Sequence, residues 1–171
     1  IIANGTGNDI SLKGTFARNV ILGENGINAG SVTLTSSAQI NVSGNCSDLY
    51  INGTLSANNT LFASGDISVS GATSASGNIT SAQSQTFNGA FTLQSDVVLS
   101  AGTNTITFKG TVNGTHALTI GNNANITNVT FEKSVGSVNK LASLDVKGTI
   151  TATAAISTTG KIVVGGTATI T

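Results

Sequence analysis

Proline, tryptophan and methionine are missing from the 171 residues of this chain, and Cys46 is its only cysteine. One cysteine cannot form an intrachain disulfide, and with a single histidine it cannot supply the ligand set of a structural zinc site. We expect Cys46 to fill space in the core, because a free cysteine usually behaves as a small buried hydrophobe. The lack of proline suits strands that pair on both sides, since proline cannot donate to a β-ladder.

Charge is also scarce: 8% of the residues are charged, seven acidic residues balance seven basic ones, and Arg18 is the only arginine. Nucleic-acid binding normally needs a basic stripe with stacking aromatics, and Tyr50 is the only tyrosine, so we expect no nucleic-acid partner. No apolar run has the length needed to cross a bilayer, and no membrane span is expected in this segment. Because 39% of the residues are hydrophobic, the chain should nevertheless fold.

Threonine, serine, asparagine and glycine are abundant instead. Threonine suits a pleated strand, as valine and isoleucine do, whereas asparagine and glycine tolerate the left-handed backbone of tight turns. Strand-like runs occur at residues 31–35, 66–70, 104–108, 161–164 and 167–171. Turn dipeptides occur at Asn25-Gly26, Asn52-Gly53, Asn88-Gly89, Asn113-Gly114 and Gly165-Gly166. The pattern predicts an all-β fold with almost no helix.

Asn-Gly turns also suit antiparallel hairpins, so alone they leave a sandwich or barrel open beside a solenoid. A repeat favours the solenoid: the pattern Phe-x-x-x-Phe/Val begins at Phe87, Phe108 and Phe131, at nearly equal intervals, and also at Phe16. About 20 residues make one coil, which returns the chain to lie one strand spacing, about 4.8 Å, above itself. We predict one domain, residues 1–171, that forms a parallel β-solenoid of roughly eight coils, with its clearest repeats in residues 83–171. Phenylalanine should stack on phenylalanine inside, with asparagine and threonine ladders outside.

The later repeats carry a family resemblance in Ser84–Leu93 (SQTFNGAFTL), Thr105–Gly114 (TITFKGTVNG), Leu141–Val146 (LASLDV) and Ile156–Gly160 (ISTTG). They resemble the β-strand repeats of filamentous-haemagglutinin-like exoproteins over about half of the chain, whereas residues 1–82 match only in composition and turn style. The resemblance implies a right-handed parallel β-helix, secretion through an outer-membrane pore, an extracellular or cell-surface location, and a role as an adhesin shaft in cell contact or biofilm formation. It implies no cofactor and supplies no binding residue.

The ends of the sequence indicate how such a solenoid would associate. The chain begins at Ile1-Ile2 without methionine or a basic segment and ends within a strand-like run, so we expect a mature product or a piece of a longer array. Neither end carries a charged or proline-containing cap over its open backbone groups. The expected partners are copies of the chain or adjoining repeats, end to end. Host or neighbouring-cell surfaces, or glycans, would be bound through other regions.

Few residues offer catalytic chemistry. His116 is the only histidine, and a general base would need a carboxylate or hydroxyl nucleophile held beside it. Asp48 and Asp66 lie near one period apart, but carboxylates stacked directly repel each other and are expected to be staggered. We therefore predict that the chain is not an enzyme. The acidic residues are scattered singly, at Asp9, Glu24, Asp48, Asp66, Asp96, Glu132 and Asp145.

One segment, Gly5–Asp9, is similar to the calcium-binding nonapeptide of β-rolls, which makes Asp9 a weak calcium candidate. Asn4 stands where the first glycine would be, and no second copy follows to complete the coordination. No other metal ligand is expected.

Thr-x-Thr pairs at residues 33–35, 105–107, 151–153 and 169–171 would suit an ice-binding face if they stacked regularly. Their spacings along the sequence are uneven, and any threonine-rich strand produces such pairs. The pairs therefore do not by themselves predict ice binding.

The chain contains nine Asn-x-Ser/Thr sequons, where its composition gives about five by chance. They are candidate glycosylation sites in an archaeal or eukaryotic source, and a consequence of composition in an ordinary bacterium. The sequon asparagines are Asn4, Asn41, Asn45, Asn52, Asn58, Asn78, Asn113, Asn125 and Asn128.

Taken together, these features predict a non-catalytic structural stalk of an extracellular adhesin or fibre. The alternative is a self-assembling subunit of an extracellular filament, sheath or surface layer. An ice-binding or polysaccharide-acting β-helix is the third hypothesis.

Overall fold

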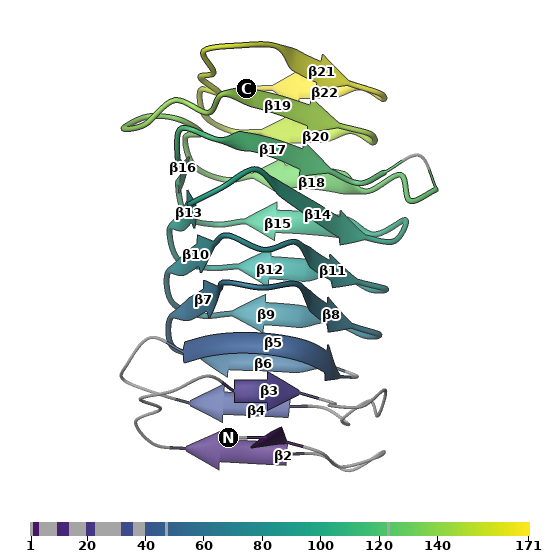
Figure 1. Cartoon of the computed structure of the whole chain (residues 1–171). Coiled ribbons are helices and arrows are strands. Elements are labelled where there is room, and N and C mark those ends of the chain that lie inside the picture. Colours follow the sequence, from purple (N-terminus) through teal and green to yellow (C-terminus); the bar gives the residue numbers. More distant parts are fainter. Residues whose placement is uncertain are drawn as a thin grey trace.

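The computed structural model describes residues 48–122 and 124–171, Cys46, and the backbone of five strands that precede them. Within these residues the chain forms strands and turns and no helix, and it winds as a solenoid whose coils lie one above another (Figure 1). The all-β parallel solenoid predicted from the repeats is confirmed.

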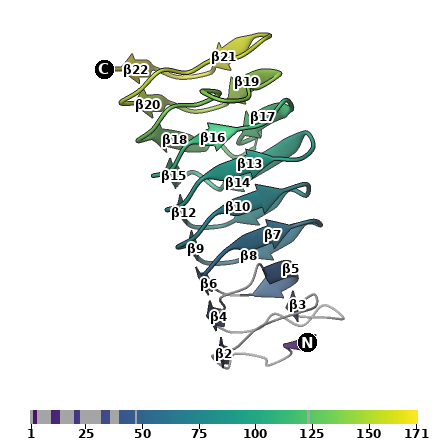
Figure 2. The same cartoon turned by 90° about the vertical axis from the view of Figure 1, so that its left-hand side faces the viewer.

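Each regular coil passes through three faces, which we call A, B and C. Face B is one nine-stranded sheet made of β2 (Ile10–Lys13), β4 (Val32–Thr35), β6 (Leu49–Asn52), β9 (Ile67–Val69), β12 (Gln85–Phe87), β15 (Thr105–Phe108), β18 (Asn128–Phe131), β20 (Ile150–Ala152) and β22 (Ala168–Ile170). Face C contains β7 (Leu55–Ala57), β10 (Thr73–Ala75), β13 (Phe91–Leu93) and β16 (Val112–Asn113). Face A contains β1 (Ile2–Ala3), β3 (Val20–Leu22), β8 (Leu61–Ala63), β11 (Ile79–Ser81), β14 (Val97–Ala101), β17 (Ala117–Ile120), β19 (Ser143–Val146) and β21 (Ile162–Val164). The long strand β5 (Ile40–Cys46) joins faces C and A, because its start pairs with β7 and its end with β8. Figure 2 shows the coils stacked in the same order from the side.

The pairing between strands is parallel throughout the described residues and sets the coil length. On face B the successive partners are Leu49, Ile67, Gln85, Ile106, Val129, Ile150 and Ala168. The coils differ in length, and the bond that joins Asp48 to Asp66 across one coil spans 18 residues. The later coil that joins Asn128 to Thr149 spans 21 residues, and the coil from Ile106 to Val129 is the longest on this face.

From β6 onward the chain makes about six turns, where roughly eight were expected for the whole of residues 1–171. The expected number is the length of the whole chain divided by the length of one coil. The part of the chain in which consecutive residues are described begins only near Leu49.

The core is a column of apolar side chains enclosed by the three faces. In most three-residue strands the first and third side chains are buried and the middle one faces out, as in β9 and β13. Phe87, Phe108 and Phe131 stack in this column, with ring centroids 5.4 Å and then 5.2 Å apart. Phe91 meets the rings of Phe87 and Phe108 edge-on, at 4.8 Å and 5.2 Å. The predicted stacking of phenylalanine on phenylalanine is confirmed.

The Phe-x-x-x-Phe/Val pattern marks the corner between faces B and C. Its leading phenylalanine ends a face B strand, and its closing residue begins the face C segment, where Phe91, Val112 and Val135 pair in succession. The copy at Phe16 differs: Phe16 lies outside the described residues, and Val20 pairs with Val42 on face A. That early copy therefore does not continue the register of the other three.

Glycines line the same corner for a steric reason. A Cβ atom built on Gly89 would collide with the backbone of Gly71 one coil below, and one on Gly110 would collide with the backbone of Gly89. The turn predicted at Asn88-Gly89 is thus a corner where successive coils approach too closely for a side chain. The dipeptide Asn25-Gly26 lies outside the described residues.

No helix in the described part of the chain is long and apolar enough to cross a bilayer.

Candidate functional site

The most regular outward surface of the molecule is on face B. On face B, each of the strands β12, β15, β18, β20 and β22 has a threonine one residue before its last residue. These five threonines pair in succession: Thr86, Thr107, Thr130, Thr151 and Thr169. A second column lies two residues earlier in the sequence, at or just before the start of the same strands, and contains Ser84, Thr105, Asn128, Thr149 and Thr167. We call these ten residues the threonine face. Eight of the ten are threonines and none is charged.

The threonines are in register although their sequence spacing is uneven. The unequal intervals between them are those of the coils themselves, because each threonine pairs directly with the next. The extra residues of the longer coils lie in turns outside face B, so they leave its ladder intact. The uneven spacing of these threonines along the sequence therefore does not prevent them from forming a regular array on face B.

The largest such insertion lies between β17 and β18, where it is anchored to the coil below. The Thr127 hydroxyl donates to the Gly102 carbonyl at 2.8 Å and accepts from the Ala101 N–H at 3.1 Å. The Asn122 side chain accepts from the N–H groups of Ala124 and Asn125, at 2.9 Å and 2.8 Å. These bonds place Asn128 at the start of β18, paired with Thr105.

The aspartates at the corner between faces A and B bind backbone. Asp48 Oδ1 accepts from the Asp66 N–H at 2.8 Å, and Asp66 Oδ1 accepts from the Ser84 N–H at 2.9 Å. Asp48 and Asp66 thus lie on successive coils at this corner, and each accepts a hydrogen bond from the coil above. They do not face each other as a general acid and base would across a substrate. Tyr50 lies beside them, and its pKa is raised by burial and, further, by the negative charges of Asp48 and Asp66.

His116 has a carboxylate partner that sequence reasoning missed. His116 Nδ1 lies 3.8 Å from Asp96 Oδ1, which also accepts from the Ala117 N–H at 2.9 Å. Their separation in the sequence, close to one coil, was the signal that could have identified the pair. Both side chains are exposed, and no hydroxyl binds His116 within the described residues. A histidine and carboxylate are thus brought together without the nucleophile of a catalytic triad.

The described residues contain no group of three histidine, cysteine or acidic side chains that could hold a metal ion. Asp9 and Glu24 lie outside the described residues, as does the rest of the Gly5–Asp9 segment.

Cys46 is fully buried, as predicted. Its thiol donates to the Phe62 carbonyl at 3.8 Å. Burial and, to a lesser degree, the charge of Asp48 raise the pKa of the Cys46 thiol from 9.0 to about 12. Such a thiol stays protonated and unreactive at neutral pH.

A buried polar residue, Gln85, was not predicted. It occupies an inward position on face B where the adjoining coils have Ile67 and Ile106. Its Nε2 donates to the Ser100 carbonyl at 2.8 Å and to Ser81 Oγ at 3.1 Å. These bonds tie face B to face A and make Gln85 a structural residue.

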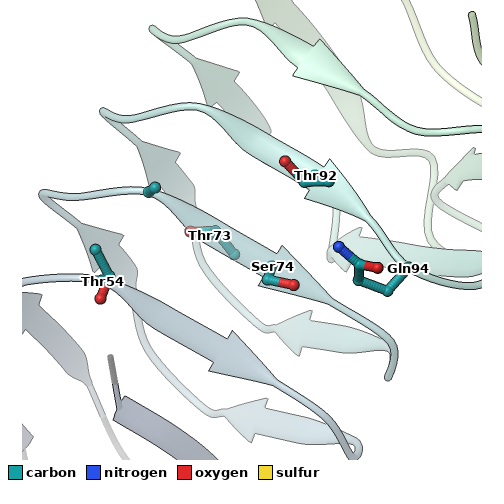
Figure 3. Close-up of a pocket in the computed structure, with 6 residues that line it drawn as sticks. Thr54, Thr73, Ser74, Thr92 and Gln94 are labelled. Carbon is teal, nitrogen blue, oxygen red and sulfur yellow. The ribbon is translucent and has the colours of Figure 1, made fainter. Parts of the chain in front are cut away.

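Face C carries a shallow depression of about 280 Å³ that spans three coils (Figure 3). Thr54, Ser74, Thr92 and Gln94 contribute polar side chains around it, and the lining contains no charged residue. It offers hydrogen-bonding groups and no general acid or base.

The sequon asparagines differ in their exposure and in the hydrogen bonds that their side chains make. Asn78, Asn113 and Asn128 accept backbone N–H groups of the coil above, from Val98, Val138 and Thr149. The sequon of Asn125 ends at Thr127, which is buried. Asn52 and Asn58 are exposed, although each makes an interaction of its own. Asn4 lies outside the described residues, as do the side chains of Asn41 and Asn45.

No protein-family model matches the chain, and no curated protein or solved structure is similar enough to match it.

Proposed function

We propose that this chain is a section of the shaft of an extracellular surface adhesin or fibre and that it is not catalytic. The observation that supports this function most directly is the unbroken parallel ladder. Every coil from β6 to β20 pairs with the coil below and the coil above on face B. In a ladder of this kind each repeat contacts only its neighbours, so each added repeat makes the stack longer. The backbone pairing between neighbouring repeats makes the stack stiff.

The polar groups of the chain serve the same purpose. Asp48, Asp66 and Asn78 each bind the backbone of the next coil, so side chains that elsewhere act on substrates here join repeats. The resemblance of residues 83–171 to filamentous-haemagglutinin-like repeats supports placing the shaft outside the cell.

Immunogold microscopy of intact source cells tests the location. Antibodies against this segment should label rods that project from the cell surface. Label confined to the cell interior would contradict the proposal. Turnover of uronate polymers by the purified chain, measured as new reducing ends, would contradict its non-catalytic part.

The second candidate function is a self-assembling filament subunit. The parallel ladders on the three faces would be continued by a further coil, whether that coil belongs to the same polypeptide or to another copy. Light scattering combined with electron microscopy distinguishes the shaft function from the filament function. A purified segment that stays monomeric supports the shaft, and fibres grown from this segment alone support the filament.

A further inference from the structure

We propose that the threonine face binds ice. The first step is its geometry, which is two-dimensional and periodic. Paired threonines lie one strand spacing apart, about 4.8 Å, and the two columns lie two residues apart along the strands, about 6.7 Å. Rows of water oxygens in hexagonal ice repeat at comparable separations. Five coils present the column from Thr86 to Thr169 without interruption. In the second column the Thr149 hydroxyl donates to Asn128 Oδ1 at 2.9 Å, so the first column supplies most of the free hydroxyls.

The second step is the chemistry of the side chains. Thr86, Thr107, Thr130, Thr151 and Thr169 make no side-chain hydrogen bond within the described residues, so their hydroxyls remain available to water. Each threonine also presents a methyl group, beside which water is already restricted in orientation. Ionic groups would impose their own hydration shells, and the ten positions contain none. Lys109 and Glu132 come immediately after β15 and β18, beyond the array.

The third step is rigidity. The stacked rings of Phe87, Phe108 and Phe131 lie directly behind the first three coils of the array, and their centroid spacings of 5.4 Å and 5.2 Å hold these coils at a fixed separation. Threonine is also stiff at its first side-chain torsion, because it is branched at Cβ. A face that is ordered before binding loses little conformational entropy when it meets a crystal. The free energies of many weak contacts with ice can then add up. On a flexible surface, part of that free energy would be offset by the entropy lost when the surface becomes ordered.

Ice is favoured over a soluble ligand because the face has no enclosing walls and no charged anchor. Face B is an open sheet, and small-molecule sites are normally concave with a few fixed polar groups. The proposal depends on the register, chemistry and rigidity of the threonine face, so it stands or falls independently of the shaft function.

Nanolitre osmometry of the purified chain with a single ice crystal tests the proposal. The wild-type chain should shape the crystal and produce thermal hysteresis. Thr130→Tyr, in the centre of the array, should reduce the hysteresis severalfold, because its ring would hold the ice surface away from neighbouring threonines. Tyrosine favours strands, so the variant should keep the fold, which circular dichroism and thermal unfolding verify.

The matched control is Thr80→Tyr, which makes the same exchange at a middle outward position on face A, between Phe62 and Ser100. It should retain wild-type hysteresis. Absence of ice shaping by the folded wild-type chain would overturn the proposal, and so would equal losses in the two variants. Sedimentation adds a further check. A wild-type dimer that Thr130→Tyr converts to a monomer would mean that the face binds a second copy instead.

Discussion

Phe108 is the residue on which most of the aromatic contacts converge. Its ring stacks on Phe87 and Phe131 and meets Phe91 edge-on, and its side chain is fully buried. Replacement by alanine removes these contacts and leaves a cavity that the enclosing ladders cannot close. We expect Phe108→Ala to lower the free energy of unfolding by about 3–5 kcal/mol in urea titrations.

Phe62 provides the control for Phe108 because it is a phenylalanine that faces outward on β8. Phe62→Ala should cost about 1 kcal/mol or less, as partly exposed positions usually do. Equal losses in the two variants would show that the ring stack is not the dominant contribution.

Cys46 should make stability depend on alkaline pH. Its pKa is about 12 in the folded chain and near 9.0 when unperturbed, so between these values the folded state holds a proton that the unfolded state has released. Its contribution to stability is therefore complete below pH 9.0 and is lost as the pH rises toward 12. In Cys46→Ala the free energy of unfolding should fall less steeply over this range, since only lysine and tyrosine still titrate. Identical slopes in the two proteins would contradict the assignment.

At the scale of the element, the corner between faces B and C sets how closely coils can stack. The backbone of Gly71 leaves no room for a Cβ on Gly89. Gly89→Ala must separate the coils locally, and we expect a loss of about 1–3 kcal/mol, as in other overpacked sites. Ala90→Ser changes an exposed residue at the same corner and should be nearly neutral. Thermal unfolding of both variants makes the comparison, and a stable Gly89→Ala would mean that the corner is not close-packed.

The strands and the stacked phenylalanines could be predicted because they depend on local alternation and on one repeated spacing. For Asp48 with Asp66 and for His116 with Asp96, a separation close to one coil could indicate that the residues are neighbours, but the atoms that meet depend on the exact length of each coil. Coil length differs from one coil to the next, as the pairing of Ile67 with Gln85 and of Ile106 with Val129 shows. The same variation concealed the threonine array, since unequal sequence intervals become equal spatial ones only after the insertions are placed outside face B. Gln85 illustrates another limit: its buried partners Ser81 and Ser100 lie on face A, and no short-range pattern connects them.

At the scale of the whole molecule, the solenoid is a one-dimensional stack in which each coil contacts mainly the coils on either side. The chain has no net charge, and among the described residues Lys147 pairs with Asp145 at 2.7 Å while His116 lies 3.8 Å from Asp96. Salt, which screens interactions between surface charges, should therefore have little effect on stability. Cohesion comes from the ladders and the apolar column, both of which act between neighbouring coils.

A local defect should consequently spread along the stack by a limited distance. In Phe108→Ala, amide hydrogen exchange should accelerate most in β12, β15 and β18, whose phenylalanines form the ring stack, and less in β6, two coils below β12. Mass spectrometry of proteolytic fragments under native conditions resolves these strands. Phe62→Ala serves again as the control, because it should leave protection in β12 to β18 close to that of the wild-type chain. Uniform acceleration from β6 to β22 would instead mean that the coils unfold as a single cooperative unit, and nearest-neighbour contacts would then no longer explain the stability of the stack.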